Sequence, residues 1–289
     1  MSCLTSRLNA ASFGSTLLPI LSFVAGGGVE ALSTAATEEY PVRRQYNARH
    51  ERGDRLIARY AGGETGARAA AREGAAVVVV DAYRASTTIA VLVQKGARVV
   101  PVASIEEAAG YPGADFRIGE RGSAKVKGFD FGNSPTEVAA AEIESGSTVA
   151  LSTTNGTRVT EAAEGAPAIF CGAFVNARAV ADALRDGLHG PRVVVVGCGW
   201  EGHRSSEDEA AAGAILHHLA GAGAELDERA ERVVALYGRH SKEVLAKNTA
   251  ARRLLRLGYE RDLGFCLAED TVPVVPRLLD GAFTGDGRG

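Results

Sequence analysis

Residues 76–80 read AVVVV and end directly in an acid, Asp81. A second run of the same kind, RVVVV, occupies residues 192–196. Strands that are buried on both faces have this composition, whereas a strand with one face in water alternates apolar and polar residues. The two runs therefore predict interior strands of a sheet that helices cover on both sides.

Shorter apolar runs and helical segments alternate between and around these two strands. The further apolar runs are residues 98–102, 148–151 and 168–171. Helical spacing is found at residues 87–95, 134–144, 175–185 and 207–219. This alternation predicts an α/β fold, a layered α/β/α arrangement with a largely parallel sheet and right-handed crossovers.

The two ends of the chain depart from this pattern. Residues 1–38 lack a repeating pattern and are expected to form a disordered N-terminal extension, although the apolar run at 15–25 has features of a weak signal peptide. Residues 39–289 are expected to form the α/β domain, in one or two lobes. Within them, the Arg-rich residues 39–74 predict a solvated helical face. Residues 271–284 contain two prolines, so we expect any strand there to lie at a sheet edge.

Composition excludes several classes of protein. The 289 residues carry a formal net charge of −3, which gives no general attraction to nucleic acid or to an anionic membrane. The four cysteines are far apart and form no CxxC pair, so zinc-ligand spacing is absent. Reduced thiols and the absence of an apolar stretch of spanning length favour a cytoplasmic protein. A homodimer is left open.

Four polar segments follow the predicted strands. In open α/β sheets, ligands bind beyond the carboxyl ends of the strands, so these segments are the candidate site. They are DAYRASTT at 81–88, GERG at 119–122 with GFDFGNSP at 128–135, STTNGTR at 152–158, and GCGWEG at 197–202 with SSED at 205–208.

The first three segments suit an anionic ligand. Asp81 could ligate a metal or act on a nucleophile, and Arg84 could bind a phosphate through its forked guanidinium. The hydroxyl and amide side chains of residues 153–157 surround one glycine at a predicted helix start, which is typical of an oxyanion cradle. Capping and turn formation would account for the same residues, as Ser134 before Pro135 illustrates.

The fourth segment permits three interpretations. Gly197, Gly199 and Gly202 fit a dinucleotide fingerprint, but Glu201 would face the pyrophosphate. Cys198 and Arg204 have the spacing of a cysteine phosphatase loop, yet the same acid opposes a thiolate. The third interpretation is a magnesium site made by Glu201 with the acids of the SSED segment, Glu207 and Asp208, because Mg²⁺ prefers oxygen ligands.

Taken in order, the four segments resemble the signature blocks of the 2-phosphosulfolactate phosphatase family. The resemblance covers roughly residues 76–219. It implies an α/β phosphatase that hydrolyses 2-phospho-3-sulfolactate to sulfolactate and phosphate with Mg²⁺, a reaction of coenzyme M biosynthesis. The N-terminal extension and the pair His203-Arg204 depart from the family pattern, so a related small phosphorylated acid stays open as substrate.

Residue roles follow from the motifs and the resemblance together. The expected catalytic residues are Asp81, Arg84 and Glu120, with water or the Asp81 carboxylate as nucleophile. The expected Mg²⁺ ligands are Asp81, Glu120, Glu201 and Asp208. The expected substrate-binding residues are Arg121, Asn133, Ser134, Thr153, Thr154, Asn155, Gly156 and Thr157, with Arg158 as a further candidate. The alternatives are a non-catalytic protein that binds an anionic metabolite or dinucleotide, and a phosphatase that depends on Cys198.

Overall fold

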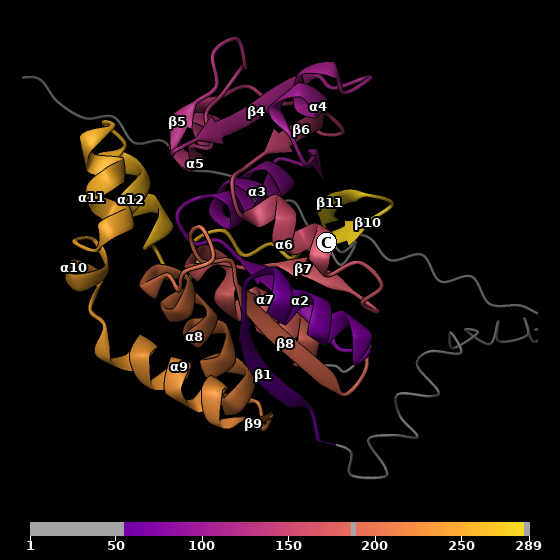
Figure 1. Cartoon of the computed structure of the whole chain (residues 1–289), viewed down its shortest axis with the longest axis vertical. Helices are drawn as coiled ribbons and strands as arrows, with labels where there is room; N and C mark the ends of the chain where they lie inside the picture. The colour runs from indigo at the N-terminus through magenta and orange to yellow at the C-terminus, as the bar shows by residue number, and fades with distance from the viewer. Residues whose placement is uncertain (1–54, 186–188, 286–289) are drawn as a thin grey trace, which may run out of the picture. The chain divides into compact units, whose positions relative to one another are not determined.

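The computed structural model describes residues 55–185 and 189–285, so the expected extension at residues 1–38 lies outside the described residues. The strands of the described part join one eleven-stranded sheet (Figure 1). Its order is β5-β4-β6-β3-β11-β10-β7-β2-β8-β1-β9. Helices cover the sheet, and the predicted layered α/β/α fold with a mostly parallel sheet is confirmed.

Strand β2 (Ala76–Val80) is the centre of the apolar packing. It lies parallel to β7 (Ile169–Cys171) on one side and β8 (Arg192–Gly197) on the other. All five residues of β2 are buried. Val77 and Val79 pack into one apolar cluster and Val78 and Val80 into another, so the side chains alternate between two covered faces. The valine runs thus form the interior strands that the sequence predicts.

Two sets of helices supply the covering layers. Residues of α2 (Gly63–Arg72), α3 (Ala85–Gln94) and α6 (Gly156–Ala162) belong to the cluster around Val77. Residues of α7 (Ala177–Arg185), α8 (Ser206–Gly221) and α9 (Glu228–Arg239) belong to the cluster around Val78. Each helix buries an apolar stripe against the sheet, which contributes about 25 cal/mol per Å² of apolar surface removed from water.

The other half of the sheet carries β4. Here β3 (Arg98–Pro101), β6 (Thr148–Ser152) and β4 (Phe116–Arg121) are parallel, and β5 (Ala124–Lys125) adds an antiparallel pair to β4. Gly119 in β4 is required by close packing, because a Cβ there would lie 2.8 Å from the Phe129 ring. The shorter elements nearby are α4 (Ile105–Gly110), α5 (Pro135–Ala140) and the 3₁₀ turn η1 (Phe174–Asn176).

The proline-containing segment does not lie at an edge, and that prediction is wrong. Strands β10 (Pro276–Leu279) and β11 (Ala282–Gly285) form an antiparallel hairpin between β7 and β3, in the middle of the sheet. The prolines are tolerated because Pro273 precedes the strand and Pro276 is its first residue, so no N–H group inside the strand is lost.

Part of the expected helical face at residues 39–74 is also a strand. β1 (Ile57–Gly62) pairs in parallel with β8, and the two-residue β9 (Glu225–Leu226) pairs with its outer side. Ala58 is fully buried in the core, the three residues after it are partly buried, and Ile57 and Gly62 at the two ends of β1 are exposed. The position near the sheet edge explains why β1 lacks a continuous apolar run.

Residues 225–268 are mostly helical. After α9 come three short helices, α10 (Lys242–Leu245), α11 (Thr249–Arg256) and α12 (Glu260–Cys266), which Figure 1 draws in yellow-orange beside α5 and α8. Among the helices in residues 55–185 and 189–285, none has the length and apolar character that a membrane span requires.

Truncation of Leu216 in α8 tests the two-layer core. Leu216 is fully buried, so Leu216→Ala is expected to lower the free energy of unfolding by about 2–5 kcal/mol through lost burial and a residual cavity. The matched control Leu257→Ala alters a half-exposed side chain and is expected to change the free energy of unfolding by less than about 0.5 kcal/mol. Urea unfolding measures both, and equal losses would contradict the assigned core.

Candidate active site at the strand ends

Four acids gather where β2, β4 and β8 end. Asp81 follows β2, Glu120 lies in β4, and Glu207 and Asp208 open α8 after β8. Burial raises the pKa of Asp81 to about 7, and the charges of Glu120 and Glu207 add to the shift. Burial, then Glu207 and Asp81, raise the pKa of Asp208 well above its ordinary value. The strand topology therefore brings these four carboxylates within electrostatic range of one another.

Glu120 has donors on both of its carboxylate oxygens. Its Oε1 accepts hydrogen bonds of 2.7 Å from the backbone N–H and the hydroxyl of Thr154, and its Oε2 accepts one of 2.7 Å from the N–H of Ser123. The side chain is 5 % exposed. Glu120 therefore fixes the loop after β6 to the turn after β4.

Asp208 joins two strand ends in the same way. Its Oδ1 accepts a hydrogen bond of 2.8 Å from the N–H of Ala82, and its Oδ2 accepts one of 2.8 Å from the N–H of Gly199. Gly199 has a φ of 71°, and a Cβ there would lie 2.3 Å from the carbonyl oxygen of His203, so only glycine fits this turn. The Asp208 carboxylate therefore accepts hydrogen bonds from backbone N–H groups at the ends of both β2 and β8.

This arrangement opposes the dinucleotide interpretation. The N–H of Gly199 is directed to Asp208, and the first turn of α8 carries three acids, Glu207, Asp208 and Glu209. In a dinucleotide site, the helix start instead presents its amides and partial positive charge to a pyrophosphate. A pyrophosphate at this helix would meet three carboxyl groups.

Asp81 and Glu207 keep unoccupied carboxylate oxygens. Asp81 Oδ1 accepts one long bond of 3.4 Å from the N–H of Ala85, and Glu207 Oε2 accepts a bond of 2.7 Å from Asn248. Within the described part of the chain, no hydrogen bond reaches Asp81 Oδ2 or Glu207 Oε1. A Cβ built at Gly156 would lie 3.4 Å from Asp81 Oδ2, so the loop after β6 adjoins this acid.

These two acids provide the donor set that Mg²⁺ uses when it bridges protein and phosphate. Among the described residues, no three His, Cys, Asp or Glu side chains form a ready-made metal site. Mg²⁺ commonly takes one or two carboxylates and completes its shell with water and substrate oxygens. The free oxygens of Asp81 and Glu207 fit that mode. In Glu120 and Asp208, by contrast, both carboxylate oxygens already accept backbone hydrogen bonds.

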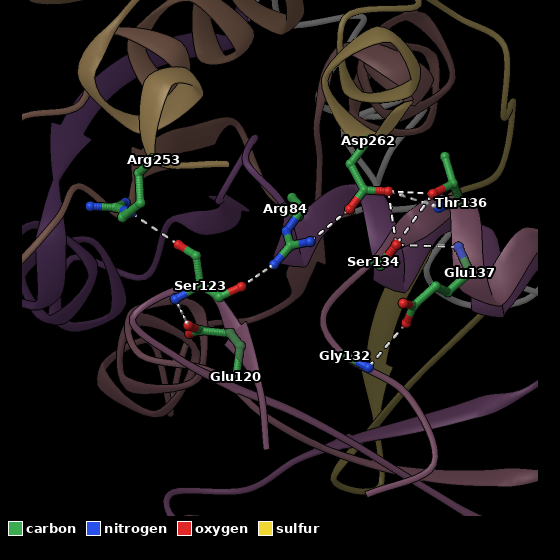
Figure 2. Close-up of polar contacts among 9 residues, drawn as sticks. All are labelled: Arg84, Glu120, Ser123, Gly132, Ser134, Thr136, Glu137, Arg253 and Asp262. Carbon is green, nitrogen blue, oxygen red and sulfur yellow. Dashed lines mark hydrogen bonds and ion pairs between the residues drawn. The ribbon is translucent and has the colours of Figure 1, made fainter. Parts of the chain in front are cut away.

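Arg84 is enclosed in a polar network that Figure 2 shows. Its Nη1 donates to Asp262 Oδ2 at 2.6 Å, and its Nη2 donates to the carbonyl oxygen of Ser123 at 2.7 Å. The ring centre of Tyr259 lies 4.0 Å from its guanidinium carbon. The side chains of Arg84 and Asp262 are 2 % and 1 % exposed. Arg84 thus ties the loop after β2 to α12 and to the turn after β4.

Asp262 also holds the segment that contains the predicted residues Asn133 and Ser134. Its Oδ1 accepts a hydrogen bond of 2.8 Å from the Ser134 hydroxyl and further bonds from Thr136 (Figure 2). Ser134 in turn accepts from the N–H of Glu137 and caps α5. Asn133 is buried, and its Oδ1 has no hydrogen-bond partner among the described residues.

The remaining predicted residues lie in or beside the loop after β6 and at the start of α6, except Glu201, which follows β8. Arg121 donates from Nη1 to the carbonyl of Glu120 at 2.7 Å and from Nη2 to Ser152 at 3.3 Å, beside the loop after β6. Within that loop the hydroxyls of Thr153 and Thr157 are 3.4 Å apart. Asn155 is the N-cap residue of α6 and makes no side-chain capping bond. Three residues are exposed: Arg121, Arg158, and Glu201, which lies in a turn with a φ of 49°.

Cys198 has the wrong surroundings for a nucleophilic thiolate. The side chain is buried, and burial raises the pKa of its thiol well above the ordinary value, with Asp81 and Asp208 adding to the shift. A reactive cysteine needs nearby positive charge that lowers its pKa. The geometry therefore disfavours a Cys198-dependent phosphatase.

The helices after α9 contribute site residues that sequence reasoning missed. Asn248 donates to Glu207, and Arg253 of α11 donates from Nε to the Ser123 hydroxyl at 3.0 Å. For Asp262 a signal was present: it shares the buried stripe of α12 with Cys266, one turn later, and an acid on such a stripe needs a buried partner. No pattern in the sequence connects Asn248 or Arg253 to the strand ends.

The comparisons with known proteins cover this site. A family profile described as 2-phosphosulpholactate phosphatase matches residues 64–281. Three relatives, each named probable 2-phosphosulfolactate phosphatase, are similar to the chain over 69–71 % of its length. The Gloeobacter violaceus protein is 41 % identical to the chain, and the alignment covers 86 % of that relative. The Thermosynechococcus vestitus protein is 39 % identical, with 87 % of its length covered. The Thermotoga maritima protein is 38 % identical, with 90 % of its length covered.

The chain belongs to the 2-phosphosulfolactate phosphatase family. The sequence resemblance is thereby confirmed, and it extends beyond residues 76–219 to the whole of 64–281. The added region includes α11 and α12, which provide Arg253 and Asp262. The family domain therefore contains both the strand-end acids and the helices that enclose Arg84.

Loss of the Asp262 charge tests the enclosed network. Asp262→Asn leaves the buried Arg84 guanidinium without its counter-charge, so we expect the free energy of unfolding to fall by about 3–5 kcal/mol. The control Asp182→Asn removes a carboxylate from an exposed pair with Arg185 and is expected to cost less than about 1 kcal/mol. If urea unfolding gave the two variants the same stability, the network would have no structural role.

The raised pKa of Asp81 predicts a pH-dependent stability. The pKa of the Asp81 carboxyl is about 7 in the folded chain, and in the unfolded chain it has its ordinary value of 3.8. The folded state therefore holds more protons between these values, and wild-type stability falls as the pH rises through this window. In metal-free buffer, the free energy of unfolding of Asp81→Asn minus that of wild type should increase as the pH rises from about 4 to about 7. Above about pH 7 this difference should stay nearly constant.

Urea unfolding at several pH values measures the difference between Asp81→Asn and wild type. Asp182→Asn is the matched control, because its exposed carboxylate gives no such pH trend. A pH-independent difference for Asp81→Asn would show that the acid is not held in a charge-disfavouring environment.

Proposed function

We propose that the protein is a Mg²⁺-dependent phosphatase that hydrolyses the phosphate monoester of 2-phospho-3-sulfolactate to sulfolactate and phosphate. The observation that carries the proposal is the pair Asp81 and Glu207, each with a free carboxylate oxygen, because Asp81 Oδ2 adjoins the hydroxyl-rich loop at residues 153–157. Family membership supports the substrate, since the relatives are named for it. A role in coenzyme M biosynthesis and a cytoplasmic location follow from that reaction and remain predictions.

Asp81 and Glu207 would hold the magnesium ion. When bound, Mg²⁺ would neutralise charge on the phosphate oxygens and favour phosphoryl transfer. This differs from the ligand set expected from the sequence, Asp81, Glu120, Glu201 and Asp208. In the proposal, Glu120 and Asp208 instead keep the loops in position, because their oxygens accept backbone hydrogen bonds.

The loop at residues 153–157 would bind the phosphate with donors other than the amide and hydroxyl of Thr154, which already bond to Glu120. Glu120 fixes this loop through Thr154, so the donors are positioned before the substrate arrives. Arg121, which lies beside Ser152, would bind the carboxylate that shares a carbon atom with the phosphate ester. Arg84 acts as a positioning residue through Asp262 and Ser123, since its guanidinium is already paired.

Asp81 would act as general base toward the attacking water. Burial holds the pKa of Asp81 at about 7 without a cation, and bound Mg²⁺ would lower it, so Asp81 would be ionised in the loaded site and able to accept a proton. The water loses its proton to Asp81 as its oxygen bonds to phosphorus. The bond from phosphorus to the ester oxygen then breaks, and the proton passes to the departing hydroxyl group of sulfolactate.

Phosphate release from 2-phosphosulfolactate tests the proposed function directly. The wild-type chain should release phosphate with Mg²⁺ and stop when EDTA is added. Asp81→Asn should lower the rate by about 100- to 10,000-fold, because it removes the base and a metal ligand together. Asp182→Asn and Cys198→Ser should stay close to wild type.

Three results would contradict this proposal. Near-normal turnover by Asp81→Asn would exclude the assigned base. Activity that survives EDTA but not Cys198→Ser would favour the cysteine mechanism. Tight binding of 2-phosphosulfolactate without any phosphate release would indicate a binding protein.

A further inference from the structure

Arg253 is a cation held in place at the rim of the acid cluster. Its Nε donates to the Ser123 hydroxyl at 3.0 Å, and its guanidinium carbon lies 3.6 Å from the ring centre of Trp200. Figure 2 shows it on the side of Ser123 opposite to Arg84. The stacked ring and the hydroxyl together fix the plane of the guanidinium, so it is positioned in advance for a planar contact.

The charge of Arg253 acts through space on Glu207, where it opposes the rise in the pKa of that acid, but Arg253 contacts no carboxylate among the described residues. Among the described residues it forms no ion pair, whereas Arg84 pairs with Asp262 and Arg204 pairs with Glu209. Its two partners, the Ser123 hydroxyl and the Trp200 ring, are neutral. Within the described part, its Nη1 and Nη2 atoms make no hydrogen bond. A half-buried guanidinium with two free donor groups is suited to an anionic ligand.

Arg253 contacts other segments than the loop at residues 153–157 that is proposed to bind the phosphate. Arg121 contacts Ser152, which directly precedes the loop at residues 153–157, and therefore lies beside the phosphate position. Arg253, a residue of α11, instead contacts Ser123 in the turn after β4 and Trp200 in the loop after β8. In 2-phosphosulfolactate the phosphate and carboxylate share one carbon atom, and the sulfonate is on the next. Arg253 contacts a different pair of loops from Arg121 and is therefore assigned to the sulfonate.

We propose that Arg253 binds the sulfonate of the substrate through its Nη1 and Nη2 atoms and thereby sets the preference for a sulfonated phosphoacid. The inference rests on the proposed function and deepens it by assigning a specificity residue. A sulfonate has three oxygens, a single charge and little basicity, so it is a better partner for a guanidinium fork than for a second metal ion.

Catalysis with a matched pair of substrates is the first test. The second-order rate constant kcat/KM is measured for 2-phosphosulfolactate and for 2-phospholactate, which lacks the sulfonate. Arg253→Met should lower the value for the sulfonated substrate about 10- to 100-fold, the loss expected for one charged hydrogen-bonded contact. The value for 2-phospholactate should change by less than about threefold. The control Arg252→Met removes an exposed guanidinium from the same helix and should alter neither value.

Binding followed by fluorescence is the second test and does not need turnover. Trp200 is the chain's one tryptophan, so its emission reports on the ring against which Arg253 stacks. Sulfolactate should quench or shift this emission at concentrations at least about tenfold lower than lactate does. Arg253→Met should bring the two apparent Kd values together. Arg253→Lys keeps the charge but loses the fork, and should retain only part of the preference. It replaces the Met variant if that variant does not fold.

The outcomes separate this inference from the proposed function. Equal losses on both substrates in Arg253→Met would overturn the sulfonate assignment and leave the phosphatase intact. If the wild-type chain hydrolyses neither substrate, the proposed function fails, and the binding test still decides on Arg253. A preference for sulfolactate that disappears in the variant would support the assignment, and equal binding of sulfolactate and lactate by wild type would refute it.

Discussion

Four buried or partly buried carboxylates at the ends of three strands must be kept in one place against their mutual repulsion. Burial and neighbouring charges disfavour the ionised form of an acid, and backbone N–H donors or a cation restore it. Asp208 receives two N–H groups, and Glu120 receives two N–H groups and a hydroxyl. Asp81 and Glu207 receive much less. The proposed metal site follows from this imbalance.

The same imbalance divides the acids by task. An acid whose two oxygens both accept backbone hydrogen bonds holds two loops together, and its removal is expected to act through their geometry. An acid with a free oxygen can accept a proton or bind a cation. The sheet provides both kinds at one edge because parallel strands end there with polar loops that are short enough to reach one another.

The last helices complete a site that begins nearly two hundred residues earlier in the chain. Asp262 holds Arg84 and Ser134, while Asn248 and Arg253 contact Glu207 and Ser123. A buried ion pair stabilises little in itself, but breaking it leaves an uncompensated charge. The loop after β2 therefore depends on the docking of α12.

The sequence predicted what is written locally in the chain. The valine runs predicted β2 and β8 because a strand covered on both faces needs no polar residue, and the four polar segments predicted the edge where the acids meet. The sequence did not reveal the hairpin β10–β11 in the middle of the sheet, since its prolines lie outside or at the start of the strand. Asn248 and Arg253 were missed because their partners are set by tertiary packing alone. The expected phosphate contact of Arg84 overlooked a partner, Asp262, that is 178 residues away.

The position of the cation is the most direct test of this account. Crystals soaked in Mn²⁺, which takes the same oxygen ligands as Mg²⁺, give an anomalous signal that locates the ion. We predict one peak that contacts the carboxylates of Asp81 and Glu207, with Glu120 and Asp208 still bound to their backbone donors. A peak on Glu120, Asp208 or Glu201, or no peak at the strand ends, would contradict it.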